Sequence, residues 1–252
     1  MEIFRNIKLF TRIVSKTYKN LNYHIETRKL SIQEEQKTPK RFDIINFILS
    51  TKNKSCSYLE IGVRNPDDCF NKVKADIKFS VDPGLEFEKN PVDFKMTSDD
   101  FFKLLKQDKL TISKDTKFDV IFIDGLHLAE QVYRDIEHSL QFIKNDGFIV
   151  LHDCNPPTSW HAREEFHYRS TPASGFWNGT TWKAFVCFRK NNKINSCTID
   201  TDWGVGIISK EKTLAPTPTT ENQFFDYYIL DKNRKDLLGL ISFEEFKHIL
   251  LS

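Results

Sequence analysis

Four short apolar segments separated by helical patterns constrain the fold of this chain more than any other feature. They read YLEIG, IKFSVD, FDVIFID and FIVLHD, at residues 58–62, 77–82, 118–124 and 148–153. The third is almost continuously apolar, as expected of a strand buried on both faces of a parallel sheet. Between them, two stretches repeat apolar side chains at helical spacing. Strands that alternate with helices form right-handed crossovers, so we predict a doubly wound α/β sheet.

Polar side chains and a glycine follow the ends of these strands. Ligands of open α/β sheets bind beyond the carboxyl ends of the strands, so these residues are candidates for a site. Gly62 would let the backbone approach a ligand closely, because it has no β-carbon. Asp82 is placed to accept both hydroxyls of a ribose. The first loop has no G-x-G-x-x-G pattern for a pyrophosphate, so a nucleoside without phosphates fits better than NAD or FAD.

The rest of the chain divides into an extension, a domain and a tail. Residues 1–40 hold nine basic and four acidic side chains, and we predict a basic amphipathic helix over Ile3–Val14 with a linker over residues 31–40. Within the domain, residues 41–212, we expect an irregular lid at 155–179 and two strands of an antiparallel hairpin at 195–209. Residues 213–252 are predicted to be a helical tail packed on the domain. Its last helix has Ser242 as N-cap and Glu245 in a capping box.

Composition narrows the range of partners. With 37 Lys and Arg against 35 Asp and Glu, the chain lacks the strong basic excess typical of nucleic-acid binding, so we expect no nucleic-acid partner. No stretch approaches the ~18 apolar residues of a membrane span, so any membrane contact would be peripheral, through the N-terminal helix. That helix could instead pack on its own domain or on a second copy of the chain. Five cysteines without C-x-x-C spacing indicate a reducing, cytoplasmic compartment.

Five motifs of the chain resemble, in order and spacing, those of class I S-adenosylmethionine-dependent methyltransferases. They are YLEIGV, SVDPG, TSDDFF, FDVIFIDGLH and FIVLHDCNPP. The resemblance spans residues 56–209 and is strongest to the branch of metal-dependent sugar and small-molecule O-methyltransferases. It implies a Rossmann-like, seven-stranded, mostly parallel sheet with an antiparallel last strand. The cofactor-binding residues that it implies are Glu60, Gly62 and Arg64 near the methionine part, Asp82 at the ribose, Ser98 and Asp99 at the adenine, and Asp124.

A second group of residues points to the methyl acceptor. Asp124, His152 and Asp153 stand at the ends of neighbouring strands, and such ligands suit a divalent ion such as Mg²⁺ or Mn²⁺. The ion would bind two vicinal hydroxyls of the acceptor and lower the pKa of one of them. DGLH at 124–127 matches the D-G-x-H motif of the resembling sugar methyltransferases, which implies that Asp124 and His127 are catalytic, with His127 as general base.

The sequence therefore predicts an O-methyltransferase that acts on a hydroxyl of a sugar, a glycan or a small molecule. Because many relatives have two adjacent carboxylates where this chain has His152 and Asp153, a softer ion or a metal-free site stays open. A metal-independent N- or protein methyltransferase of the same fold is one alternative. Others are a metal-dependent hydrolase or hydroxylase that also uses His161, and a non-catalytic module that binds a partner through its N-terminus. The lid histidines His161 and His167 are candidates for substrate contact.

Overall fold

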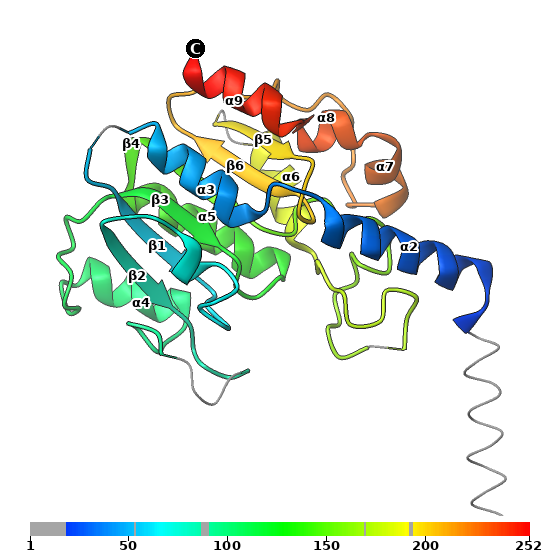
Figure 1. The fold of residues 1–252 in the computed structure, drawn as a ribbon, viewed down its shortest axis with the longest axis horizontal. Coiled ribbons are helices and arrows are strands. Elements are labelled where there is room, and N and C mark those ends of the chain that lie inside the picture. The colour runs from blue at the N-terminus through cyan, green and yellow to red at the C-terminus, as the bar shows by residue number, and fades with distance from the viewer. Residues whose placement is uncertain (1–18, 53, 87–90, 169, 192–193) are drawn as a thin grey trace, which may run out of the picture.

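The computed structural model describes residues 19–52, 54–86, 91–168, 170–191 and 194–252, and they form one sheet with helices on both faces (Figure 1). The helix predicted over Ile3–Val14 lies outside the described residues. The strands are β1 (Ser57–Ile61), β2 (Ile77–Val81), β3 (Phe118–Ile123), β4 (Ile143–Leu151), β5 (Asn195–Ile199), β6 (Val205–Ser209) and β7 (Leu240–Ile241). The helices are α2 (Asn22–Gln36), α3 (Arg41–Ser50), the 3-10 helix η1 (Phe70–Lys72), α4 (Ser98–Lys106), α5 (Ala129–Phe142), α6 (Thr181–Asn191), α7 (Tyr227–Lys232), α8 (Arg234–Leu238) and α9 (Phe243–Leu251).

In the described part of the chain the sheet has seven strands, in the order β2-β1-β3-β4-β6-β5-β7. Strands β1 to β4 pair in parallel, whereas β6 runs antiparallel to both of its neighbours, β4 and β5. The hairpin predicted over residues 195–209 is β5–β6, with Asn195 paired to Ser209 and Ile199 to Val205. The Rossmann-like, mostly parallel sheet is therefore confirmed, with the antiparallel strand β6 inserted between β4 and β5.

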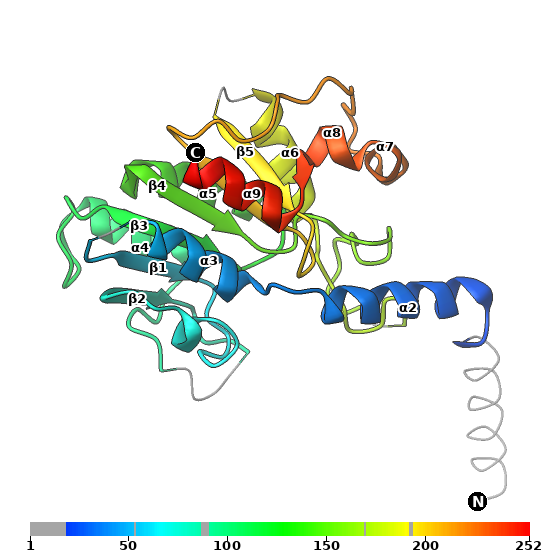
Figure 2. The same ribbon diagram turned by 45° about the horizontal axis from the view of Figure 1, so that its top comes forward.

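The strands in the middle of the sheet are buried because helices cover both of its faces (Figure 2). Alternate side chains of β3 enter different cores. Ile121 packs in the core that contains residues of α4, α5 and α6, and Phe122 packs in the core that contains residues of α3 and α9. Each strand must therefore be apolar on both sides, which leaves its polar residues to the strand ends.

The linker predicted over residues 31–40 is wrong for its first six residues, because α2 continues to Gln36. The four residues that α2 buries are polar: His24, Thr27, Ser31 and Glu34. Both views show α2 beside the irregular segment that follows β4 (Figures 1 and 2). The helix is stabilised there by tertiary contacts that a polar sequence does not reveal, since Ser31 Oγ lies 2.9 Å from Nε2 of His161.

The tail contributes a strand as well as helices. β7 pairs in parallel with β5 at the edge of the sheet, where Ile199 faces Ile241. The predicted capping box of α9 is present, because the Ser242 hydroxyl accepts from the Glu245 amide at 3.2 Å and the Glu245 carboxylate accepts from the Ser242 amide at 2.7 Å. Among the residues that the structure describes, no helix is long and apolar enough to span a membrane.

Candidate active site

The strand ends surround a cavity of about 570 Å³ at the carboxyl edge of the sheet. Because β1 to β4 are parallel, the residues that follow them reach the same edge. Sites for small molecules have volumes of roughly 300–1,000 Å³, so the cavity is large enough for one. The predicted site residues that line it are Glu60, Gly62, Arg64, Asp82, Ser98, Asp124, His127, His152 and Asp153.

Asp99 is not among the residues that line the cavity. It lies in the first turn of α4, where its carboxylate is 3.4 Å from Nε of Arg134 and 3.8 Å from Nε2 of His138. An acidic side chain in a first turn also stabilises the helix dipole. Its neighbour Ser98 does line the cavity, and the Ser98 hydroxyl accepts a hydrogen bond from Gln131 at 3.1 Å.

Glu60 is buried at the end of β1, with 3% of its surface exposed. The hydroxyl of Tyr58 donates a hydrogen bond to its carboxyl group at 2.5 Å. Burial raises the pKa of Glu60 to about 8, and the nearby Asp124 adds to the rise, while Tyr58 and Arg41 oppose it. The carboxyl group therefore keeps its proton at neutral pH, and a cation placed beside it would favour its ionised form.

Gly62 is required by the packing of two loops, and it also lines the cavity. Its φ of +88° lies in the region that favours glycine. A β-carbon there would lie 2.3 Å from Cα of Gly125, in the loop after β3. The loops after β1 and β3 can therefore meet beneath the cavity because both positions lack a side chain.

Asp82 and Arg64 occupy different positions around the cavity. Asp82 follows β2, and its Oδ1 accepts a hydrogen bond from the Gly84 amide at 2.6 Å, an Asx turn that orients the carboxylate. Arg64 has 62% of its side chain exposed and pairs with Asp68 at 3.3 Å. Asp82 is therefore held in place by its own turn, whereas Arg64 stands at the solvent-facing rim.

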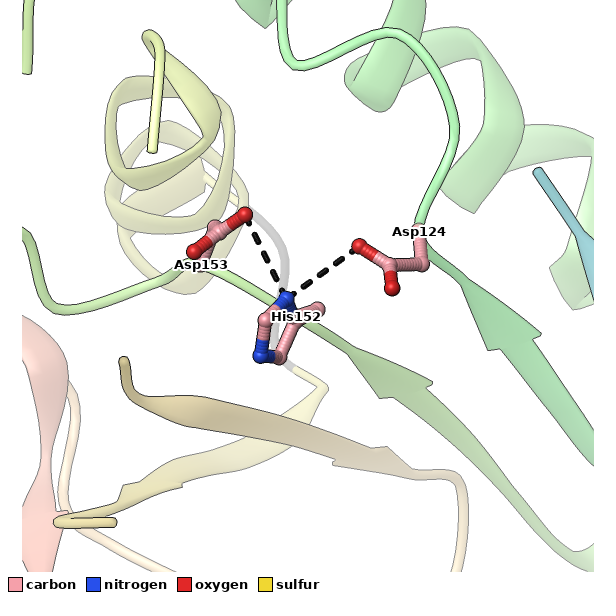
Figure 3. A group of neighbouring side chains, drawn as sticks. All are labelled: Asp124, His152 and Asp153. Carbon is pink, nitrogen blue, oxygen red and sulfur yellow. Dashed lines mark ion pairs between the residues drawn. The ribbon is translucent and has the colours of Figure 1, made fainter. Parts of the chain in front are cut away.

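Two aspartates and two histidines, Asp124, His127, His152 and Asp153, form a compact group that we call the His–Asp cluster. Figure 3 shows His152 between the two aspartates. Nδ1 of His152 lies 3.2 Å from Oδ1 of Asp124 and 3.3 Å from Oδ2 of Asp153. The residues come from the ends of adjacent strands β3 and β4, so the parallel register brings them together. Asp153 has a φ of +61°, an unusual backbone conformation for an aspartate and of a kind often found at functional sites.

His127 also bridges both aspartates of the cluster. Its Nε2 lies 3.3 Å from Oδ1 of Asp124, and its Nδ1 lies 3.1 Å from Oδ2 of Asp153. The indole of Trp177 stacks on the imidazole, with ring centroids 5.1 Å apart and planes inclined by 19°. The ring of His127 is thus fixed by two carboxylates at its nitrogen atoms and by an aromatic ring on its face.

Electrostatic coupling within the cluster shifts the ionisation of its members. Burial opposes the charged form of His152, but the Asp153 and Asp124 carboxylates outweigh it and hold the pKa of His152 well above its usual range. The pKa of His127 is raised in the same way, because the Asp153 and Asp124 carboxylates outweigh the effect of burial. Burial would raise the pKa of Asp124, but the charge of His152 and hydrogen bonds from both histidines hold it well below its usual range. Positive charge is therefore stabilised at this position.

Three members of the cluster fit a divalent metal ion. Asp124, His152 and Asp153 each offer a ligand atom, and these atoms lie within 4.8 Å of one another. Two carboxylates and one imidazole make a mixed donor set, which suits Mn²⁺ or a softer first-row ion better than Mg²⁺. The residues present therefore fit a metal ion, and they favour one that accepts nitrogen as well as oxygen.

The sequence analysis assigned no role to Arg41 or Asp202, yet both contact the cluster. Nη1 of Arg41 lies 3.0 Å from Oδ2 of Asp202 and 3.3 Å from Nε2 of His152, and its Nε lies 3.6 Å from Oδ2 of Asp124. Arg41 begins α3, and Asp202 lies in the turn between β5 and β6, 161 positions later. The turn residues TDWG indicate a turn in the sequence, but no local pattern indicates a partner so far along the chain.

The lid is the other element that the structure brings to the cavity. Phe166, Phe176, Trp177 and Asn178 line it, together with Trp203 of the β5–β6 turn. Nδ2 of Asn178 donates a hydrogen bond to Oδ1 of Asp153 at 2.7 Å. The substrate contact predicted for His161 is wrong, because this side chain is fully buried away from the cavity.

A doubly wound sheet with its site at the carboxyl edge, and with an antiparallel strand inserted near one end, defines the class I methyltransferase architecture that the motifs imply. Residues 59–154 match the family model described as a methyltransferase domain. This segment of the chain is therefore similar to methyltransferase domains, and it holds Glu60, Asp82 and the whole His–Asp cluster.

Several solved structures resemble a large part of the chain distantly. An O-methyltransferase from Bacillus cereus in complex with SAH is 10% identical, with 79% of this chain and 97% of that chain covered and a TM-score of 0.39. An SAH-bound methyltransferase from Podospora anserina is 15% identical, with 80% and 95% covered and a TM-score of 0.41. MycE, a mycinamycin-pathway methyltransferase in complex with Mg, SAH and mycinamycin VI, is 14% identical, with 67% and 49% covered and a TM-score of 0.37. No curated protein matches the chain in sequence.

Proposed function

We propose that this chain is an S-adenosylmethionine-dependent O-methyltransferase that acts on a hydroxyl of a sugar, a glycan or another small molecule and uses a divalent ion. The observation that carries this proposal is the position of His127. Its ring is held between two carboxylates that can also bind the ion, in the same cavity as Glu60 and Asp82. A base, a metal site and a nucleoside site in one cavity are the parts that such a reaction needs.

The cofactor side of the cavity suits a positively charged nucleoside. S-adenosylmethionine, when bound, supplies the methyl group from a sulfonium ion. Asp82 would accept the ribose hydroxyls, and Glu60 would lose its proton and pair with the ammonium group of the methionine part. Gly62 and Gly125 form a floor without side chains. The acidic lining therefore favours a cation and not a phosphate.

The acceptor side would prepare the hydroxyl for attack on the methyl group. A divalent ion held by Asp124, His152 and Asp153 would lower the pKa of a bound hydroxyl. His127 would take the proton, since Asp124 and Asp153 stabilise the imidazolium that forms. Fixing the acceptor in line with the methyl group can lower the barrier by about 7–11 kcal/mol.

The wall of the cavity indicates the class of acceptor. Phe166, Phe176, Trp177 and Trp203 present aromatic side chains to it. Aromatic faces suit the C–H surface of a sugar ring or another flat ring, and the metal site suits vicinal hydroxyls on that ring. We therefore favour a ring that carries a diol. The four buried cysteines, which form no disulfide, support a reducing, cytoplasmic location.

Calorimetry with S-adenosylhomocysteine tests the cofactor site. Asp82→Ala should weaken binding at least about tenfold, because the ribose loses a charged acceptor of hydrogen bonds. Asp115→Ala removes an exposed aspartate outside the cavity and should leave the affinity unchanged. If the wild-type protein binds no S-adenosylhomocysteine, or if Asp82→Ala binds it equally well, the proposed function fails.

Titration with Mn²⁺ tests the metal site separately. Asp153→Asn should weaken Mn²⁺ binding about 10- to 100-fold, since the site loses a charged ligand. Methyl transfer should stop in EDTA and return when Mn²⁺ is added. Transfer that continues undiminished in EDTA would contradict the metal site and favour a site in which His127 and His152 act directly.

A further inference from the structure

A buried histidine in the lid connects α2 to the active site. His161 is fully buried and lies behind the cavity wall. Its Nε2 is 2.9 Å from Oγ of Ser31 in α2, and its Nδ1 is 2.8 Å from Oγ1 of Thr158. Ser31 is itself only 1% exposed, so this contact between α2 and the lid is shielded from water.

The hydrogen bonds define which ring nitrogen of His161 carries the proton. The hydroxyl of Ser31 donates to the carbonyl of Thr27 at 3.0 Å, so its single proton is already used. Nε2 of His161 must then donate to Ser31, and Nδ1 must accept from Thr158. Burial lowers the pKa of His161 to about 4, with the charge of Arg163 in the same direction, which agrees with a neutral ring.

The backbone of His161 holds the end of a lid segment, residues 176–179, that we call the lid strip. The carbonyl of His161 accepts hydrogen bonds from the amides of Asn178 at 3.0 Å and of Gly179 at 3.2 Å. On its other side the strip contacts the His–Asp cluster through the Trp177 ring, which stacks on His127, and through the side-chain Nδ2 of Asn178, which donates a hydrogen bond to Asp153. The strip therefore lies between His161 and the cluster.

Gly179 shows how closely the strip approaches the cluster. Its φ is +61°, and a β-carbon there would lie 2.1 Å from the carbonyl oxygen of His127. The next residue, Thr180, donates its amide to the same carbonyl at 2.7 Å. A small displacement of the strip would therefore disturb the backbone of His127 as well as its stacking partner.

We propose that His161 is a positioning residue that, held by Ser31 of α2, fixes the lid strip against His127 and Asp153. Helix α2 is thus part of the acceptor side of the site. This inference rests on the proposed function in taking His127 as the base. The hydrogen bonds and ion pairs described for α2 and its C-cap Lys37 reach the lid, Lys40 before α3, and Asp200 of the β5–β6 turn. The cofactor side is instead built on the ends of β1 and β2. Loss of the Ser31 contact should therefore weaken binding of the acceptor and leave binding of the cofactor unchanged.

Amide hydrogen exchange of the full-length protein tests this inference without any acceptor. Ser31→Ala and Thr158→Val each remove one hydrogen bond of the His161 ring, and the amides of Asn178 and Gly179 should then exchange about fivefold faster. Ser50→Ala is the matched control, because it removes an exposed serine hydroxyl that bonds to Phe47 in α3. Unchanged exchange at residues 176–180 in both lid variants would overturn the proposal.

Two further measurements separate positioning from general stability. His161→Gln keeps an N–H donor and an oxygen acceptor, so it should restore much of the protection that His161→Leu loses. Both should bind S-adenosylhomocysteine within about twofold of wild type, while the KM for the acceptor rises in His161→Leu. Equal loss of cofactor affinity in His161→Gln and Ser31→Ala would contradict the proposal. If wild type itself bound no cofactor, the proposed function would fail while the exchange data still decided the role of His161.

Discussion

Glu60 carries a buried carboxyl group whose environment suits a cationic ligand. Tyr58 is its hydrogen-bond donor, and Asp124 adds negative charge nearby. A buried carboxyl group of this kind stays protonated until a positive charge binds nearby and favours its ionised form. Binding of a cation would therefore be coupled to loss of the Glu60 proton. Because Asp124 also raises the pKa of Glu60, the ionisation of Glu60 depends on both sides of the cavity.

Replacement of Glu60 by Gln should stabilise the ligand-free protein at neutral pH. Burial raises the pKa of Glu60 from 4.5 to about 8, so folding takes up a proton between these values and wild-type stability falls as pH rises through that range. Gln does not ionise, so the variant should gain about 3 kcal/mol at pH 7 and nothing below pH ~4. Urea unfolding at several pH values measures the difference.

The control for this prediction is Glu26→Gln, which makes the same chemical change on the exposed surface of α2. Its stability should follow wild type at every pH. The Glu60→Gln variant should also bind S-adenosylhomocysteine more weakly, because it lacks the charge that pairs with the ammonium group. A variant that is less stable than wild type at pH 8 would show that the carboxyl group is ionised and well paired in the folded state.

At the scale of elements, the site depends on how closely the strand ends approach one another. The loops after β1 and β3 touch at Gly62 and Gly125, and the lid strip touches His127 at Gly179. In each case the backbones meet without a side chain between them. The distances within the His–Asp cluster therefore depend on loop packing, because the residues of the cluster follow the ends of β3 and β4.

Gly62→Ala should open the contact between the loops after β1 and β3. The new β-carbon would lie 2.3 Å from Cα of Gly125, and the φ of +88° is strained for alanine, so the variant should lose about 2–4 kcal/mol of stability. Gly175→Ala is the matched control for stability, since its β-carbon would meet no atom within 4 Å. Thermal unfolding measures both variants, and equal melting temperatures would refute the packing role of Gly62.

At the scale of the whole molecule, the tail completes the domain. β7 extends the sheet beyond β5, and α9 covers the face on which α3 lies. Phe246 of α9 is fully buried in the core that contains Val120 and Phe122 of β3. The extension at the other end of the chain is also bound to the body, through Ser31 and Lys37. Both ends of the described chain are thus joined to the folded unit.

Phe246→Ala should destabilise the whole molecule by about 3–5 kcal/mol, because it leaves a large cavity in the core. Leu251→Ala in the same helix changes a side chain on a residue that is 70% exposed and should stay within about 0.5 kcal/mol of wild type. A cooperative unfolding transition that moves as one unit in Phe246→Ala would show that tail and domain unfold together. A separate early transition confined to the tail would show the opposite.

The sequence by itself determined the elements of the sheet and the residues at its ligand-binding edge. Buried strands must be apolar, so FDVIFID and FIVLHD stand out as continuous patterns, and their polar neighbours follow at fixed positions. Parallel pairing then brings Asp124, His127, His152 and Asp153 together, because the carboxyl ends of β3 and β4 meet. Local signals were sufficient there, as they were for the capping box at Ser242.

Only the tertiary structure decided which distant residues support the ligand-binding edge of the sheet. Arg41 and Asp202 meet across 161 positions, and Ser31 meets His161 across 130. Such pairs have no spacing that a sequence pattern can express, because each residue looks like an ordinary polar surface residue until the fold buries it. For the same reason the sequence did not predict the end of α2, whose buried face is polar. It did not predict β7 either, because this strand has only two residues and forms by pairing with the edge of β5.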